Sequence, residues 1–292
     1  MTPQLHLSQL ERYRAQTFRL LPELQVRTLD DALHFVNERG FVYFWPIKEV
    51  ILPSLWTAVA GERPVADQHD DPGHVTWGWK DNMLDKRKWY YAKLLRGRAT
   101  LVSLEIVPHF YALSENFGDP EHDFLQLYRD GLLSQPAKAI YEALLEAGPL
   151  DTVNMRRRIR MTSKSSDSPF ERALVELQRD MKILPVGVAQ TGAWRYSFIY
   201  ELVHRYYPDL PERARAITRN AARQKLTALF FDGVGAATAA DVRRLFQWKP
   251  KDLNRTLQTI VQDGHAFAGY SVEGHTEAHY VAARLQAQAP SA

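Results

Sequence analysis

The chain has 292 residues, which is enough for two or three domains of ordinary size. It contains no cysteine, which excludes disulfides, thiolate catalysis and cysteine-ligated zinc or iron–sulfur sites. No apolar run is long enough to span a bilayer, and the first residues lack the basic-then-apolar order of a signal peptide. We therefore expect a cytoplasmic protein that spans no membrane.

Basic residues gather in a few segments, although the formal net charge is only +3. Residues 213–225 carry five of them and no acid, and residues 80–98 carry seven against two acids. Such clusters attract phosphate groups. The alternative is that each cluster is only the solvated face of a helix.

The N-terminal region is predicted to be rich in helices. After a first helix at residues 5–20, a second begins at Thr28 with a capping box to Asp31 and ends at Gly40. Residues 41–45 are aromatic and β-branched, which predicts a buried strand. The following elements are helices at 47–60, 80–96 and 108–114, with a polar loop at 61–73 and a strand at 100–106.

Residues 134–200 form a module of three helices and a two-stranded ribbon. Ser134 caps the first helix, Gly148-Pro149 ends it, and Asp151 begins a short second helix. The remaining elements are a third helix at 169–181 and strands at 183–190 and 194–200 around a Thr191-Gly192 turn.

The same order of elements recurs between residues 212 and 281. A long helix is expected from Glu212 to Asp232, and Thr238 caps a short helix through a capping box with Asp241. The remaining elements are a third helix at 250–262 and strands at 267–272 and 279–282 around a Glu273-Gly274 turn. The tail from Leu285 is expected to fray. Three helices followed by a ribbon is the order of a winged helix, and two basic copies in tandem indicate nucleic-acid binding.

Several short stretches resemble the winged-helix DNA glycosylases of the AlkZ/YcaQ type, which unhook alkylated bases and interstrand crosslinks. These stretches are Gly148-Pro149-Leu150, 170–174, 177–180, 192–196, 235–238 and 241–245. The resemblance implies three tandem winged helices wrapped around a duplex, the first of them degenerate. The predicted fold is therefore mainly α with small β ribbons, in three tandem winged-helix (helix-turn-helix) domains. Their expected bounds are residues 1–122, 123–208 and 209–292.

The resemblance fails at the family's catalytic motif. Family members carry Gln-x-Gln or Gln-x-Asp/Glu, which positions the water that attacks the sugar, whereas the matching triplet here is Tyr43-Phe44-Trp45. A tyrosine with a pKa near ~10 is a poor general base, and a tryptophan N–H only donates. The triplet argues against the usual glycosylase activity but not against the DNA-binding fold.

A polar loop offers a replacement site for acid–base chemistry. Asp70, Asp71 and His74 lie there beside His69, and together with Tyr43 they are the candidate catalytic residues. Their spacing matches no metal motif, so no metal is expected. The alternative is an ordinary polar loop that precedes an aromatic core segment.

The aromatic residues after this loop favour positions in the core. They are Trp77, Trp79, Trp89, Tyr90 and Tyr91. The alternative is a platform for stacked bases, because Lys80, Lys86, Lys88 and Lys93 are interleaved with them.

The candidate DNA contacts are basic residues of the two modules. Arg215, Arg219 and Arg223 recur every four residues, which predicts one shared helix face. The alternative interpretation of any single residue is an ordinary solvated side chain. As a set, these residues are expected to bind phosphates. The full set is Arg156, Arg157, Arg158, Lys164, Arg172, Arg179, Arg195, Arg215, Arg219, Arg223, Lys249, Lys251 and Arg255.

We predict a protein related to alkylation- and crosslink-repair glycosylases that binds double-stranded DNA, intact or damaged, as a monomer and without a cofactor. One alternative is an active DNA glycosylase, an N-glycosyl hydrolase with an altered site. Two others are a winged-helix transcriptional regulator and a winged-helix adaptor between proteins.

Overall fold

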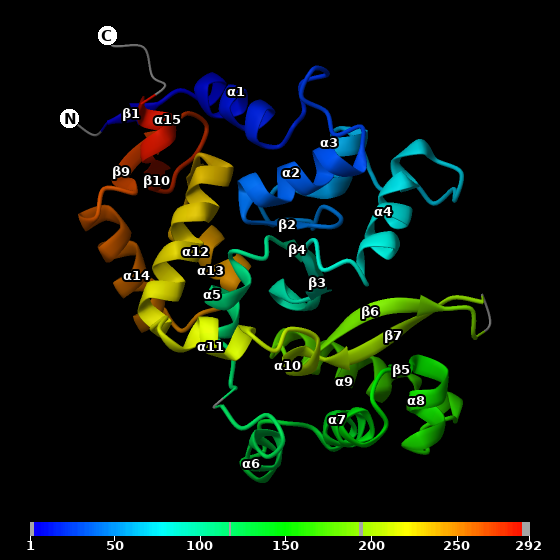
Figure 1. Ribbon diagram of the computed structural model, residues 1–292. Helices are drawn as coiled ribbons and strands as arrows, with labels where there is room; N and C mark the ends of the chain where they lie inside the picture. Colours follow the sequence, from blue (N-terminus) through cyan, green and yellow to red (C-terminus); the bar gives the residue numbers. More distant parts are fainter. Residues whose placement is uncertain (1–2, 117, 193–194, 288–292) are drawn as a thin grey trace.

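The computed structural model describes residues 3–116, 118–192 and 195–287. The fold is mainly helical with three small sheets, as the sequence predicts (Figure 1). The strand orders of the sheets are β1-β9-β10-β8, β2-β4-β3 and β5-β7-β6. No helix within these described ranges is long and apolar enough to cross a membrane.

The N-terminal part is built around the antiparallel sheet of β2 (Phe41–Tyr43), β4 (Ala99–Val102) and β3 (Tyr90–Lys93). Its helical elements are α1 (Leu7–Thr17), α2 (Leu29–Arg39), α3 (Leu55–Ala60), η1 (Pro72–His74), α4 (Val75–Met83), η2 (Leu95–Gly97) and α5 (Val107–Tyr111). The capping box of α2 is confirmed, because the Thr28 hydroxyl accepts from the Asp31 N–H and the Asp31 carboxylate accepts from the Thr28 N–H.

Two of the predicted helices are wrong over much of their length. Only the end of segment 47–60 is helical, because Pro53 disfavours helix in the residue before it and Ser54 then caps α3. Segment 80–96 leaves the helical state after Met83, and its aromatic residues form the buried strand β3 paired with β4. Pairing in a sheet and burial of the rings outweigh local helix preference there.

The first module contains α7 (Gln135–Ala147), α8 (Thr152–Arg158) and α9 (Asp167–Arg179) around the sheet of β5 (Leu150–Asp151), β7 (Ser197–Leu202) and β6 (Ile183–Ala189). Its shorter helices are α6 (Asp123–Arg129), η3 (Lys164–Ser166) and α10 (Val203–Tyr206). Ser134 caps α7 and Asp151 caps α8, as predicted. The predicted start of the second ribbon strand, at Trp194, lies outside the described residues.

The second module contains α11 (Leu210–Arg215), α12 (Arg219–Val234), β8 (Ala236–Ala237), α13 (Ala239–Phe246), α14 (Pro250–Gln262), β9 (Ala266–Val272), β10 (His279–Ala282) and α15 (Ala283–Ala287). The Thr238–Asp241 capping box is confirmed. The predicted long helix from Glu212 is instead two helices, because the Thr218 hydroxyl caps α12 by accepting from the Ala221 N–H. The predicted frayed tail lies outside the described residues beyond 287.

The N-terminus joins the C-terminal sheet rather than its own neighbours in sequence. Strand β1 (Gln4–Leu5) pairs in parallel with β9, and β1 and α15 lie on the same side of the molecule (Figure 1). The Arg14 guanidinium donates to the carbonyl oxygens of Val234 and Ala236 at 3.0 and 2.8 Å. Helix α1 is therefore bound to the end of α12.

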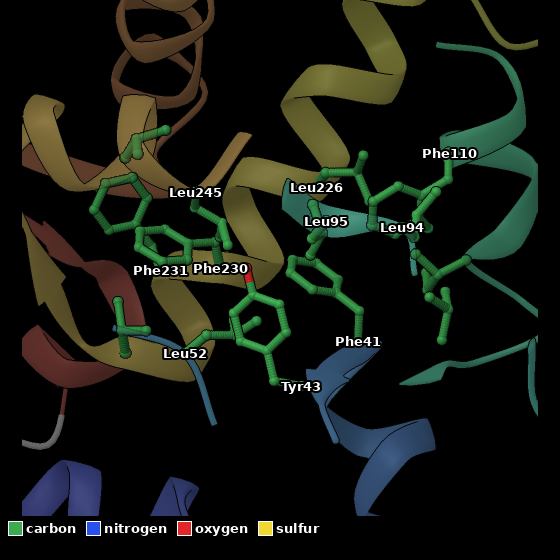
Figure 2. Packing of buried hydrophobic residues seen from close by; sticks show 14 of the residues in the cluster. Phe41, Tyr43, Leu52, Leu94, Leu95, Phe110, Leu226, Phe230, Phe231 and Leu245 are labelled. Atoms are coloured by element: carbon green, nitrogen blue, oxygen red, sulfur yellow. The ribbon is translucent and has the colours of Figure 1, made fainter. Parts of the chain in front are cut away.

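One apolar core extends through all three parts of the chain. It joins Phe41 and Phe110 of the N-terminal part, Met181 of the first module, and Leu226 and Leu245 of the second. Figure 2 shows several of these side chains packed together around Tyr43. Two further cores lie within the N-terminal part and the first module. The three parts are thus held around a common apolar junction.

Candidate nucleic-acid interface

Helix α9 of the first module packs directly on β3 and η2 of the N-terminal part. The Gln178 side-chain oxygen accepts from the Lys93 backbone N–H at 3.0 Å. Gly97 has a φ of +67°, and a Cβ there would lie 2.8 Å from the Val175 Cγ1. Only glycine permits both this backbone conformation and so close an approach of η2 to α9.

Arginines from two parts of the chain meet where α9 reaches η2. Arg172 and Arg179 are exposed on α9, two turns apart, and line one surface hollow with Lys93. Arg179 also lines a cavity with Arg96, which is exposed on η2. Neither Arg96 nor Arg179 has a side-chain hydrogen bond or ion pair within the described ranges, so both are free to bind an anion.

The second module supplies arginines on the other side of the same cavity. The Arg223 guanidinium lies 5.9 Å from the centre of the Trp248 ring, and Trp248 lines the cavity. Arg223 also pairs with Asp252 at 3.1 Å. Burial lowers the pKa of Arg223, and the positive charges of Arg219 and Arg255 act in the same direction. Arg219 donates to the Leu113 carbonyl oxygen and pairs with Glu115, two residues that line the cavity. Arg255 lies three residues after Asp252 on α14.

These residues form one surface that crosses the junction of all three parts, here called the basic band. It comprises Arg96, Arg172, Arg179, Arg219, Arg223 and Arg255. Its acidic neighbours are largely paired: Glu171 lies 3.8 Å from the Lys93 ammonium, Glu176 accepts from Ser134, and Glu115 pairs with Arg219. Lys249 and Lys251 are exposed at the start of α14, the helix that also carries Arg255.

Other predicted DNA contacts lie apart from the band or are engaged elsewhere. Arg215 is on α11 and pairs with Glu212 at 2.8 Å, so the predicted shared helix face with Arg219 and Arg223 is wrong. The helix break at Thr218 is the reason. Arg156 donates to the Met161 carbonyl at 2.8 Å and lies over the Phe170 ring, so it stabilises the loop before α9.

The remaining predicted contacts are exposed on the first module. Arg158 pairs with Glu146 at 2.9 Å, whereas the side chains of Arg157 on α8 and Lys164 on η3 make no hydrogen bond or ion pair within the described ranges. Arg195 is exposed in the turn of the β6–β7 ribbon, next to residues that the structure does not describe. A role for these side chains in DNA binding stays a prediction.

Tyr43 is entirely buried, at 0% exposure, and packs in the shared core. Its hydroxyl has no hydrogen-bond partner among the described residues, and burial raises the pKa of Tyr43 to about 12. Figure 2 shows its ring among the side chains of Leu52, Phe230 and Phe41. A phenol in this position is neutral at physiological pH and is not in contact with solvent.

The other candidate catalytic residues lie on the loop before α4, away from Tyr43. Asp71 pairs with Arg63 at 2.6 Å and accepts from the Gly73 N–H. The hydrogen bond from Arg63 lowers the pKa of Asp71 more than any other interaction does. The His74 Nε2 lies 2.8 Å from the Ala66 carbonyl oxygen, and Asp70 is exposed. In the described part of the chain, no group of three or more His, Cys, Asp or Glu residues could hold a metal ion.

The predicted core positions of the aromatic segment after this loop are confirmed in part. Trp89, Tyr90 and Tyr91 are buried, whereas Trp79 is partly exposed and Trp77 is 36% exposed. Lys80 is only 2% exposed, and its ammonium lies 4.4 Å from the centre of the Phe198 ring and 3.0 Å from the Tyr196 hydroxyl. Lys80 is therefore part of the packing between α4 and the β6–β7 ribbon and cannot contact phosphates.

Two residues of the junction were not among the sequence-based candidates. Arg96 belongs to the basic segment 80–98, but nothing local distinguishes it from its neighbours. Trp248 follows α13, and tryptophan is more often a core residue than a surface contact. Only the tertiary approach of η2 to α9 and α13 brings the two residues to one cavity.

The fold and the basic band define a mainly helical protein whose three parts meet at a positively charged junction. The chain belongs to the AlkZ-related family, whose sequence model matches residues 26–247. It is similar in structure to the Streptomyces sahachiroi DNA glycosylase AlkZ, with a TM-score of 0.59 and 13% sequence identity, over 98% of this chain and 73% of that one. No curated protein sequence matches the chain. The predicted family resemblance is thus confirmed, and the structural likeness concerns the fold.

Proposed function

We propose that this protein binds double-stranded DNA along the basic band. The observation that carries the proposal is that arginines from η2, α9, α12 and α14 converge on one surface although they are far apart in sequence. Arginine side chains donate to phosphate oxygens, and a row of them follows a sugar–phosphate backbone. The proposed partner agrees with the structural relative, which is a DNA glycosylase.

In this proposal the two modules act as winged helices. Their third helices, α9 and α14, carry Arg172 and Arg255 of the band and would lie against a groove. The N-terminal part, with α2, α3, α4 and the β2-β4-β3 sheet, is the degenerate third unit. The proposed units keep the bounds 1–122, 123–208 and 209–292, with β1 and α1 bound to the last of them.

Salt-dependent binding to a duplex tests this function. The affinity for a duplex of arbitrary sequence is expected to fall as salt rises, because each neutralised phosphate contributes about 0.9 to the slope of log K against log salt. Arg179→Ala and Arg255→Ala are each expected to weaken binding roughly tenfold, from the loss of one charge-assisted hydrogen bond, about 1.5 kcal/mol. Each should also lower the slope by about one. Fluorescence anisotropy at several salt concentrations measures both quantities.

Arg129→Ala is the matched control for this test. Arg129 is an exposed arginine on α6, outside the band. It should leave affinity and slope unchanged. Undetectable binding, or binding that does not depend on salt, would end the proposal. A strong preference for one duplex sequence would favour a transcriptional regulator instead.

Base excision is the second candidate function, and the name of the structural relative favours it. The burial of Tyr43 and its raised pKa oppose a role for this residue as general base. We expect no release of bases from a methylated or crosslinked duplex. Alkaline cleavage at abasic sites, followed on a gel, measures this. If cleavage products appear, Asp70→Asn, Asp71→Asn and His74→Ala then show whether the loop supplies the chemistry.

A further inference from the structure

A cavity of about 240 Å³ lies in the middle of the basic band. The buried residues Leu95, Phe110 and Leu226 are part of its lining, together with polar and charged side chains. One wall is aromatic, because the Trp248 ring stacks on Phe246 with 4.3 Å between ring centres and 9° between planes. Below we refer to this cavity as the junction pocket.

The polar groups of the junction pocket are two arginines, one amide and two carboxyl groups. Arg96, Arg179 and Gln247 are exposed, and within residues 3–116, 118–192 and 195–287 their side chains make no hydrogen bond or ion pair. Arg96 and Gln247 both have positive φ, 54° and 58°, which is uncommon outside glycine. The fold thus holds two guanidinium groups, one amide and the carboxyl groups of Glu115 and Asp180 around a cavity with one aromatic wall.

We propose that the junction pocket holds one nucleobase that has left the stack of a duplex bound on the basic band. This inference rests on the proposed DNA binding. The Trp248–Phe246 wall offers a flat surface for the ring, while Arg96 and Arg179 hold the adjacent phosphates. The Gln247 amide can both donate to and accept from the edge of a base. The two carboxylates of the lining, Glu115 and Asp180, accept from base N–H groups.

The size and position of the pocket favour this occupant. Pockets for drug-sized ligands have roughly 300–1,000 Å³, so this smaller cavity suits a single base better than a whole nucleotide. A larger cavity of about 550 Å³, lined by Trp45, His74 and Trp77, has no arginine or lysine in its lining. It offers nothing to hold phosphates.

The experiment compares two duplexes that differ by one unpaired nucleotide. A base that is already unstacked costs less to extrude, so the protein should bind a duplex with a single-nucleotide bulge more tightly than the fully paired one. The expected preference is about fivefold or more, the lower end for one base stacked on an aromatic ring. Anisotropy titrations with both duplexes at the same salt concentration measure it.

Two variants test the pocket itself. Trp248→Ala removes the stacking surface, and Gln247→Gly removes the amide while it suits the positive φ. Both should abolish the preference, measured as the ratio of the affinities for the bulged and the paired duplex. Tyr128→Ala, at an exposed ring on α6, is the aromatic control and should keep the preference. A bulge that carries 5-iodouracil should crosslink under ultraviolet light to the peptide containing Phe246 and Trp248.

The possible outcomes separate the two proposals. If both duplexes bind equally well, or if both variants keep the preference, the pocket does not hold a base although the protein binds DNA. A crosslink at another site would also show that the pocket does not hold the base. If neither duplex binds, the proposed function fails and this inference fails with it.

Discussion

At the scale of single residues, a buried charge ties the first module to the N-terminal part. The Lys80 ammonium lies near five aromatic rings, pairs with Asp81 and donates to the Tyr196 hydroxyl. Burial lowers the pKa of Lys80 from its ordinary value of 10.5, although Asp81 opposes this. The folded protein therefore releases the lysine proton at a lower pH than the unfolded chain does.

This shift predicts how a Lys80→Met variant differs from the wild type as pH changes. Between the lowered folded pKa and 10.5, the unfolded chain binds the extra proton, so the wild type becomes more stable as pH rises. The variant lacks this contribution. The difference in unfolding free energy should therefore move in favour of the wild type as the pH rises towards 10.5, as urea denaturation measures. Lys86→Met, at an exposed lysine, is the matched control. A difference for Lys80→Met that does not change with pH would contradict the argument.

At the scale of elements, η2 and α9 are in contact because Gly97 has no side chain. Gly97→Ala is expected to lose about 1–2 kcal/mol of unfolding free energy from the positive φ, and about 1–3 kcal/mol more from the contact with Val175. Adding Val175→Ala to the Gly97→Ala variant should recover only the unfolding free energy that is lost through the contact with Val175. Thermal or urea unfolding measures each step.

Gly131→Ala provides the matched control. Its φ of +69° is nearly the same, but nothing lies within 4 Å of the added Cβ. This variant should lose only the unfolding free energy that the positive φ costs an alanine. If Gly97→Ala costs no more than Gly131→Ala, the close approach of η2 to α9 is not a stabilising constraint.

Elements that depend on local signals could be predicted from the sequence, and those that depend on tertiary contacts could not. The capping boxes at Thr28 and Thr238 mark real helix starts, because each involves residues only three apart. Strand β3 was not predicted, because it forms a strand by pairing with β4, which is a tertiary contact. Five of the six arginines of the basic band were candidates from the sequence, namely Arg172, Arg179, Arg219, Arg223 and Arg255. Arg96 was not, because it joins them only through the packing of η2 on α9.

At the scale of the whole molecule, the shared core predicts that the three parts unfold together. Leu10 is 2% exposed on α1 and contacts the region of Gly235, where a Cβ would lie 3.1 Å from the Leu10 Cδ1. Leu10→Ala should cost about 2–5 kcal/mol and shift one cooperative transition. Tryptophan fluorescence and far-ultraviolet circular dichroism should give the same midpoint in urea.

The control is Leu132→Ala, at a leucine that is 63% exposed. It should change the unfolding free energy by no more than about 0.5 kcal/mol. Two separate transitions in the Leu10→Ala variant, with only one of them shifted, would show that the parts are energetically independent.

The pairing of β1 with β9 also determines an order of events during synthesis. Gln4 and Leu5 face Ser271 and Val272 in the sheet, so their partners are made long after them. At about 5–20 residues per second, strand β1 waits on the order of tens of seconds for β9. During that interval the first module, with its own core, can already fold. Strand β1 is thus made early but reaches its native position late.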